Sequence, residues 1–226
     1  MQKRILFVTA TALESRALER VEGIKAENGV FRFGHFEIVP LVAGVGQVST
    51  VYNISKWLAR NGHPDIALNT GIAGSFKADP AAGAVVIIKN DCFADLGIED
   101  HEKFLTLAER GLADPDEFPF SNGWIHADEK YISLFEKKFT AVNAITVNTV
   151  TGSDKTISRL VEKFNPSLET MEGASFFYIC RRESIPFLAI RAVSNSIEPG
   201  NRHTWKIELA LESLSLRLRE IFLMLE

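Results

Sequence analysis

The chain is poor in cysteine and has no long hydrophobic run. Cys92 and Cys180 are its two cysteines, and both stand among apolar neighbours. We interpret them as free core thiols rather than a disulfide, which is typical of reducing cytoplasm. No segment reaches the about 20 apolar residues that span a bilayer. The first apolar run is also too short for a secretory signal. We therefore expect a cytoplasmic protein with no membrane partner.

Two further classes of protein are disfavoured by what the sequence lacks. Its histidines show none of the paired spacing that zinc or iron sites use, so we expect no metal. They are His35, His63, His101, His126 and His203. The formal net charge of −4 leaves no basic excess of the kind that binds nucleic acid.

Short apolar runs alternate with helical patterns along the whole chain. A length of 226 residues, 46% of them hydrophobic, fits one domain over residues 1–226. The expected strands are Arg4–Thr9, Gly29–Gly34, Phe36–Ala43, Asp65–Asn69, Ala84–Ile88, Asn143–Thr149 and Phe187–Val193. The expected helices are Ala12–Val21, Val48–Arg60, Gly173–Arg182 and Trp205–Leu225. This alternation predicts a three-layer α/β/α domain with a mixed, mostly parallel central sheet. The segment Asp95–Trp124 fits neither pattern and is expected to be an insertion or lid.

Two glycine clusters could bring backbone close to a ligand. Ala43–Gln47 (AGVGQ) lies between a strand and a helix, but it lacks the third glycine of a dinucleotide fingerprint. We therefore expect no nicotinamide cofactor. Asn69–Ser75 (NTGIAGS) follows a strand. Either cluster alone is more typical of a tight turn than of a binding site.

Two acids, one amide and one arginine are placed where chemistry could occur. Glu14 and Glu172 each stand near the start of an expected helix, where an acid also favours the helix dipole. Glu172 has apolar neighbours, so a buried carboxylate there needs partners such as ribose hydroxyls. Asn195 ends a strand, as a turn-forming residue also would. Arg191, in the same apolar strand, is more typical of a structural ion pair than of a substrate contact.

Together these segments resemble the nucleoside phosphorylase/nucleosidase superfamily, and specifically its hydrolase branch. FVTATALESRAL resembles the first strand and acid-bearing helix of that branch, and AGVGQV and NTGIAGS resemble its two glycine loops. ETMEGASFFYIC is similar to the ribose-binding motif, and IRAVSN to the base-binding strand end. The resemblance covers nearly the whole chain and keeps the order of the motifs.

The resemblance implies an enzyme that cleaves the N-glycosidic bond of a purine nucleoside without a cofactor. It implies that Glu14 and Asn195 are catalytic and that Met171 and Glu172 bind ribose. The residues expected to contact the base are Ala73, Gly74, Thr151, Gly152 and Ser194. Those that would contact the 5′ group are Arg202, Phe104 and Phe120. It also implies a homodimer, with Asp95–Phe120 near the partner's pocket.

Asn195 departs from the aspartate that methylthioadenosine/S-adenosylhomocysteine nucleosidases carry at this position. An asparagine amide can donate to a 6-oxo group and accept from a protonated N7, which matches hypoxanthine or guanine. The segment around Asn195 is similar to futalosine hydrolases, which release hypoxanthine from a menaquinone precursor. We therefore predict a futalosine-type hydrolase. A methylthioadenosine-type nucleosidase, a purine nucleoside phosphorylase and a binding module without turnover are the alternatives.

Overall fold

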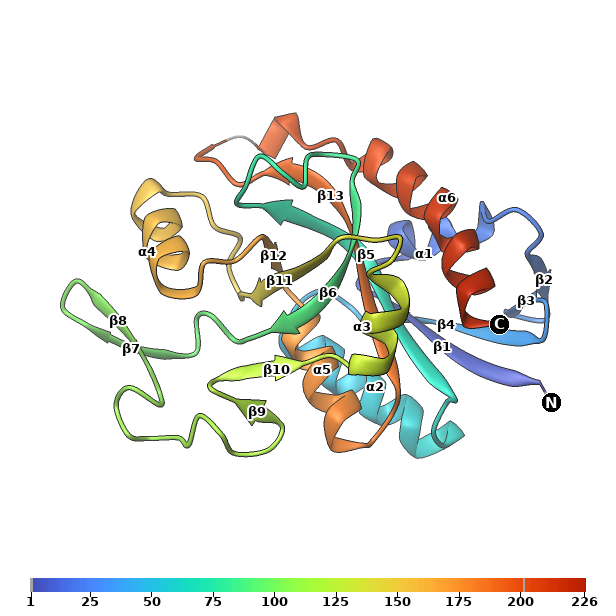
Figure 1. The fold of residues 1–226 in the computed structure, drawn as a ribbon, viewed down its shortest axis with the longest axis horizontal. Coiled ribbons are helices and arrows are strands. Elements are labelled where there is room, and N and C mark those ends of the chain that lie inside the picture. Colours follow the sequence, from blue (N-terminus) through green and yellow to red (C-terminus); the bar gives the residue numbers. More distant parts are fainter. Residues whose placement is uncertain (1, 201) are drawn as a thin grey trace.

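A computed structural model describes residues 2–200 and 202–226 of the chain, which are built around one mixed β-sheet (Figure 1). Its strands, within the described residues, are β1 (Lys3–Thr9), β2 (Lys25–Glu27), β3 (Val30–Phe33), β4 (Phe36–Val42), β5 (Ile66–Ser75), β6 (Val85–Asp91), β9 (Phe120–Ser121), β10 (Trp124–His126), β11 (Ala141–Thr146), β12 (Leu168–Thr170) and β13 (Phe187–Ser196). A separate hairpin is formed by β7 (Gly97–Asp100) and β8 (Lys103–Thr106).

The centre of the sheet closes on itself. β1 pairs in parallel with β4 and β5, and β5 pairs in parallel with β13. β13 also pairs with β6, so β5, β12, β11, β6 and β13 form a closed circuit of strands. β1 and the first half of β13 are buried on both faces of the sheet. Their sequences are therefore continuous apolar runs.

Helices cover both sides of this sheet (Figure 1). They are α1 (Ala12–Glu19), α2 (Gln47–Asn61), α3 (Glu129–Phe135), α4 (Asp154–Phe164), α5 (Gly173–Arg182) and α6 (Ile207–Leu225). α1 and α6 contribute to one hydrophobic core, α2 and α5 to a second, and α4 to a small third one. The apolar stripe of α6 includes Leu214, Leu218 and Ile221, each with no exposed surface. Burying such a side chain contributes about 1.5–3 kcal/mol. The α/β class with a mixed central sheet is thereby confirmed.

Most expected elements exist, with ends shifted by a few residues, and three differences matter for the site. β5 continues through the second glycine cluster to Ser75, so this segment is strand and not a turn. The last helix begins at Ile207, after a short 3-10 turn at Arg202–Thr204. The irregular segment 95–124 contains the β7–β8 hairpin and β9. β2, β10, α3, α4 and β12 were not predicted.

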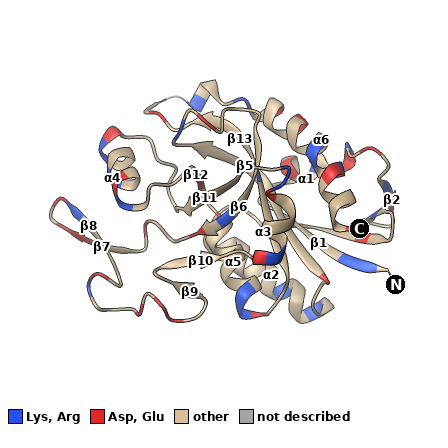
Figure 2. Ribbon diagram, viewed as in Figure 1, with Lys and Arg blue, Asp and Glu red and all other residues tan. Residues whose placement is uncertain are grey.

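The cysteines and the charges complete this picture. Cys92 and Cys180 are both buried and free, as predicted. Among the residues that the structure describes, no helix is long and apolar enough to cross a membrane. Figure 2 shows charges of both signs mixed along the helices and outer loops, with few on the central strands.

Candidate active site

A cavity of about 610 Å³ opens where β1, β5 and β13 end. The carboxyl ends of parallel strands are the usual place for a ligand crevice in α/β sheets. Its lining includes residues from these three strand ends, from the turn before α5 and from the loop before α4. The lining residues are Ala10, Thr11, Glu14, Val45, Ile72, Ala73, Gly74, Val150, Thr151, Gly152, Glu169, Thr170, Met171, Glu172, Ser194, Asn195, Ile197, Glu198, Gly200, Arg202 and Trp205.

Glu14 is held rigidly at one side of this cavity. It is the third residue of α1 and closes a capping box with Thr11. The backbone N–H and the hydroxyl of Thr11 both donate to Glu14 Oε2, each at 2.9 Å. The backbone N–H of Ile72 donates to Oε1 at 3.1 Å. A Cβ at Gly71 would lie 2.5 Å from Oε1, so the first glycine of GIAGS makes room for this carboxylate.

Glu172 stands at the start of α5. It is the N-cap residue, and its Oε1 accepts the backbone N–H of Gly46 at 2.8 Å. Gly46 belongs to the first glycine cluster, which therefore does supply a backbone donor to the cavity. Burial raises the pKa of Glu172, the Gly46 bond and the charge of Arg191 oppose this, and the charge of Glu14 adds to it. The two carboxylates are therefore close enough to interact.

A β-bulge aims the end of β13 at the cavity. Val193 pairs with Ala73 and Asn195 with Gly74, so Ser194 is the additional residue. The hydroxyl of Ser194 donates to Asn195 Oδ1 at 2.7 Å, and Asn195 Nδ2 donates to Ser196 O at 3.0 Å. The Ser196 carbonyl can only accept, so it fixes Nδ2 on its side and places Oδ1 toward the Ser194 hydroxyl, which also lies 3.2 Å from Ala73 O. The Nδ2 group of Asn195 has a second proton and its Oδ1 has a second lone pair. Both remain for a ligand.

Arg191 is structural, but it does not form the ion pair that we expected. One nitrogen donates to the backbone oxygens of Asn69 and Ile190, and the other donates to the side-chain oxygen of Asn69. No salt bridge joins it to a carboxylate among the described residues. Its charge still reaches Glu172, Glu14 and Asp91 across the core, because it is fully buried. Carbonyl oxygens accept its N–H bonds, while Glu172, Glu14 and Asp91 offset its charge from a longer range.

Two buried acids were missed by the sequence reasoning. Glu169 lines the cavity, and its Oε1 accepts the backbone N–H of Thr151 at 2.9 Å. Asp91 lies beneath the start of α5, where Thr146 donates to Oδ1 at 2.9 Å. Burial raises the pKa of Glu169, and it raises that of Asp91 to about 7. Asp91 ends the apolar strand β6, a signal that the sequence did offer, whereas Glu169 is the middle residue of the short β12, which has no apolar run.

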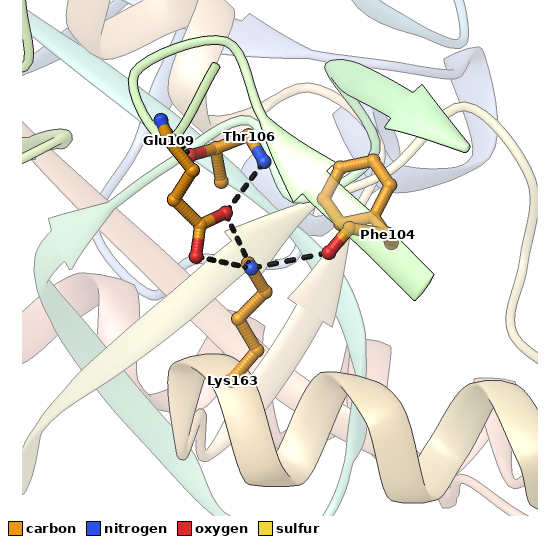
Figure 3. A network of polar contacts seen from close by, with 4 residues as sticks. All are labelled: Phe104, Thr106, Glu109 and Lys163. Carbon is orange, nitrogen blue, oxygen red and sulfur yellow. Dashed lines mark hydrogen bonds and ion pairs between the residues drawn. The ribbon is translucent and has the colours of Figure 1, made fainter. Parts of the chain in front are cut away.

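Among the residues expected to bind a 5′ group, only Arg202 lines the cavity. Phe104 lies in β8 and packs beneath Arg159 and Lys163 of α4. Lys163 also donates to Phe104 O and pairs with Glu109, which ties the hairpin to α4 (Figure 3). Phe120 contacts Phe93 and Tyr178 instead. All other predicted site residues line the one cavity.

The lining is acidic and suited to organic ligands. Glu14, Glu169, Glu172 and Glu198 all contribute, and Arg202 is the only cationic side chain among the described lining residues. No group of three or more potential metal ligands occurs in residues 2–200 and 202–226. Paired carboxylates and an oriented amide can stabilise positive charge, orient water and hydrogen-bond a heterocycle.

The chain belongs to the Phosphorylase superfamily, whose family model matches residues 4–225. The chain is 25% identical to a futalosine hydrolase from Thermus thermophilus over 186 residues, covering 81% of this chain and 80% of that protein. It is 24% identical over 180 residues to a 5′-methylthioadenosine/S-adenosylhomocysteine nucleosidase from Buchnera aphidicola, covering 79% and 74%.

Solved structures agree on the fold. The structure of futalosine hydrolase from Helicobacter pylori superposes with a TM-score of 0.78 at 17% identity, and the match covers 100% of this chain and 98% of that one. These relatives support an enzyme that hydrolyses the N-glycosidic bond of a nucleoside. They do not by themselves select between the two substrates.

Proposed function

We propose that the protein hydrolyses the N-glycosidic bond of a 6-oxopurine nucleoside, and that its substrate is futalosine. The observation that carries this proposal is the convergence of Glu14, Glu172 and Asn195 on one cavity. Two acids serve a sugar that becomes cationic, and an oriented amide serves the departing base.

Glu172 and Met171 bind the ribose in this proposal. A carboxylate oxygen can accept a hydrogen bond from each of the 2′ and 3′ hydroxyls. As the bond between C1′ and the base lengthens, positive charge develops on the sugar. A buried carboxylate beside it stabilises that charge strongly, because water does not screen the interaction.

Glu14 acts on the attacking water. Three donors from Thr11 and Ile72 fix its carboxylate, so the direction of its remaining lone pairs is set before substrate arrives. A general base fixed in this way contributes roughly 10²–10⁴-fold to the rate. The acid also opposes phosphorolysis, since it would repel a phosphate dianion at the same place.

Asn195 favours a 6-oxo base over a 6-amino base. The Ser196 carbonyl fixes the orientation of the amide, which leaves one Nδ2 proton for O6 and one Oδ1 lone pair for the protonated N7. A 6-amino group would place donor against donor at Nδ2. The base contacts proposed for Ala73, Gly74, Thr151, Gly152 and Ser194 are supported by their positions in the lining.

Futalosine is preferred among 6-oxopurine nucleosides because its 5′ extension carries an aryl carboxylate. Trp205 and Arg202 stand together in the lining and offer an aromatic face and a cation. Futalosine hydrolases and 5′-methylthioadenosine/S-adenosylhomocysteine nucleosidases both match this chain. The match to the futalosine hydrolases supports futalosine as the substrate. Hypoxanthine and the dehypoxanthinyl sugar would be the products.

We further propose a cytoplasmic homodimer, in which a second copy covers apolar surface next to the cavity. Val48 and Tyr52 of α2 are 81% and 60% exposed, and Val45 of the cavity lining is 54% exposed. Exposed apolar patches of this kind are typical of interfaces. Sedimentation velocity tests this, with about twice the 25.1 kDa chain mass expected. A single species of monomer mass at micromolar concentration contradicts it.

The substrate is tested by measuring base release from futalosine, inosine and methylthioadenosine, each with and without phosphate. We expect hypoxanthine from futalosine at a rate that phosphate does not change. Faster adenine release from methylthioadenosine would establish the other nucleosidase activity. Release that requires phosphate would establish a phosphorylase.

A further inference from the structure

The first turn of α5 is capped by two threonines rather than by its own N-cap residue. Glu172 makes no side-chain bond to the helix, and its carboxylate instead accepts a backbone N–H of the first glycine cluster. The N–H of Gly173 donates to Thr170 Oγ1 at 3.2 Å, and that of Ala174 donates to Thr146 Oγ1 at 2.7 Å. Because these hydroxyls satisfy the end of the helix, the side chain of Glu172 can turn toward the cavity.

Asp91 completes this cap from beneath the helix. The hydroxyl of Thr146 donates its one proton to Asp91 Oδ1 at 2.9 Å, while its oxygen accepts the N–H of Ala174. The hydroxyl of Thr170 lies 3.2 Å from that of Thr146 and accepts the N–H of Gly173. Asp91 has no exposed surface, and it is not among the described residues that line the cavity. Any effect of Asp91 on a ligand is therefore indirect, through the threonines and α5.

The residue after Glu172 is glycine for a steric reason. A Cβ at Gly173 would overlap Asp91 Oδ2 and would lie 2.9 Å from Thr170 Oγ1. The carboxyl group of Asp91 thus occupies the space of a side chain directly beneath the start of α5. Its Oδ2 has no hydrogen-bond partner among the described residues, so packing against Gly173 holds this oxygen. The position of Asp91 is therefore coupled to the backbone that carries Glu172.

Asp91 is mostly neutral below pH 7. Burial raises its pKa to about 7 against the opposing Thr146 bond and the charge of Arg191, and the charge of Glu172 adds to the rise. The titratable groups around it are Glu172 of α5, Arg191 of β13 and Cys92, whose thiol stays neutral because burial raises its pKa too. β11 and β12 present threonine hydroxyls to this region. Below pH 7 Asp91 therefore adds no second negative charge beneath Glu172.

We propose that Asp91 is a positioning residue for Glu172, and that through Thr146 and the start of α5 it holds the ribose-binding carboxylate in place for the 2′ and 3′ hydroxyls. This inference rests on the proposed function, in which Glu172 binds the ribose. Without Oδ1, the Thr146 hydroxyl can rotate away from Ala174, and the space left beneath Gly173 lets the first turn of α5 shift. Glu172 would then lose its alignment with the two hydroxyls, whereas the base contacts at the ends of β5 and β13 would remain.

The test measures how much the enzyme gains from the 2′ hydroxyl of its substrate. The ratio of kcat/KM for futalosine to that for 2′-deoxyfutalosine is compared between the wild type and Asp91→Ala. The greater lability of the deoxynucleoside cancels, because both proteins act on the same pair. A hydrogen bond to a carboxylate contributes about 10- to 100-fold, so we expect the ratio to fall about 10-fold or more in the variant. Glu212→Ala on exposed α6 is the matched control and should keep the wild-type ratio.

The conservative variant Asp91→Asn should rescue the ratio. Its carbonyl can still accept the Thr146 hydroxyl, and the amide is neutral as the protonated acid is. At pH 6 we therefore expect a ratio within a few-fold of the wild type. If Asp91→Ala does not fold, Thr146→Val takes its place, since it removes the bond to Asp91 at nearly the same volume. Its ratio should fall as that of Asp91→Ala does.

Equal ratios in the wild type and Asp91→Ala, with kcat/KM reduced alike on both nucleosides, would overturn the proposal and show a purely structural role. If the wild type cleaves methylthioadenosine instead, the proposed substrate fails, and the comparison is made with methylthioadenosine and its 2′-deoxy analogue. If it cleaves no nucleoside, the dissociation constants of inosine and 2′-deoxyinosine give the ratio. An unchanged ratio in either case would also overturn the role of Asp91.

Discussion

The two sides of the cavity hold their buried carboxyl groups in different ways. On the side of α1, Glu14 receives three hydrogen bonds, which reach both of its oxygens. On the side of β12 and α5, Glu169 in the lining and Asp91 beneath Gly173 each have one buried oxygen without a partner among the described residues. The first arrangement fixes a charged group in one position. The second leaves hydrogen-bonding capacity inside the protein, and burial raises both pKa values there.

This difference teaches what each side is suited to do. A carboxylate bonded at both oxygens keeps its orientation, as a general base requires. A buried carboxyl oxygen without a partner costs stability in the folded protein. The α1 side is therefore suited to chemistry, and the fold is expected to be least stable on the side of β12 and α5.

The largest expected effect comes from replacing Glu14, on the α1 side, by its neutral amide. Glu14→Gln keeps a carbonyl to accept the Ile72 N–H, but it removes the proton acceptor. We expect kcat to fall about 10²–10⁴-fold with KM changed only a few-fold. Steady-state kinetics with futalosine measures this, and Glu212→Gln on exposed α6 is the matched control. A variant that loses binding and retains kcat would remove Glu14 from the chemical step.

Asp91, on the side of β12 and α5, is tested by the pH dependence of the free energy of unfolding. The pKa of Asp91 is about 7 in the folded protein and 3.8 as the ordinary value, chiefly because of burial. Because the folded state binds the proton more tightly, this stabilisation is complete below pH 3.8 and is lost as pH rises through 7. The free energy of unfolding should fall by up to about 4 kcal/mol over this window.

Asp91→Asn should flatten this dependence, since its carbonyl can still accept the Thr146 hydroxyl and nothing titrates. Urea denaturation of both proteins between pH 4 and pH 8 measures the difference. Some slope should remain, because burial also raises the pKa values of Glu169 and Glu172. Equal slopes in the two proteins would show that Asp91 keeps an ordinary pKa.

The smallest expected effect in this comparison is that of Glu169→Gln on the free energy of unfolding, which should change by about 1 kcal/mol or less. It changes hydrogen bonding at one oxygen and leaves the Thr151 anchor in place. Large losses of stability in this variant would mean that the β12 side depends on charge as much as the α1 side does.

Much of the fold could be predicted from the sequence because buried strands read as apolar runs. Lys3–Thr9 and Phe187–Ser196 were found within a few residues in this way. The end of β5 was missed because glycine has little strand propensity and is typical of turns. Here Gly71 and Gly74 stay in the strand so that Glu14 and Asn195 can approach its backbone.

The candidate site was predicted in its principal residues but not in its full chemistry. Glu14, Glu172 and Asn195 stand at the ends of predicted elements, where parallel topology brings them together. Glu169 belongs to the unpredicted β12, and only pairing with Gly74 shows that it faces the same cavity as Asn195. Phe104 was expected near the ligand, but the register of the β7–β8 hairpin and the Lys163 contacts hold it against α4. Register and tertiary contacts of this kind cannot be read from local sequence.

The most direct test of the account is to follow futalosine cleavage in ¹⁸O-enriched water that also contains phosphate. We predict release of hypoxanthine without the label and a free sugar that carries ¹⁸O at C1′ and no phosphate, because water and not phosphate attacks that carbon. A sugar 1-phosphate without the label, or no hypoxanthine release at all, would contradict the central claim.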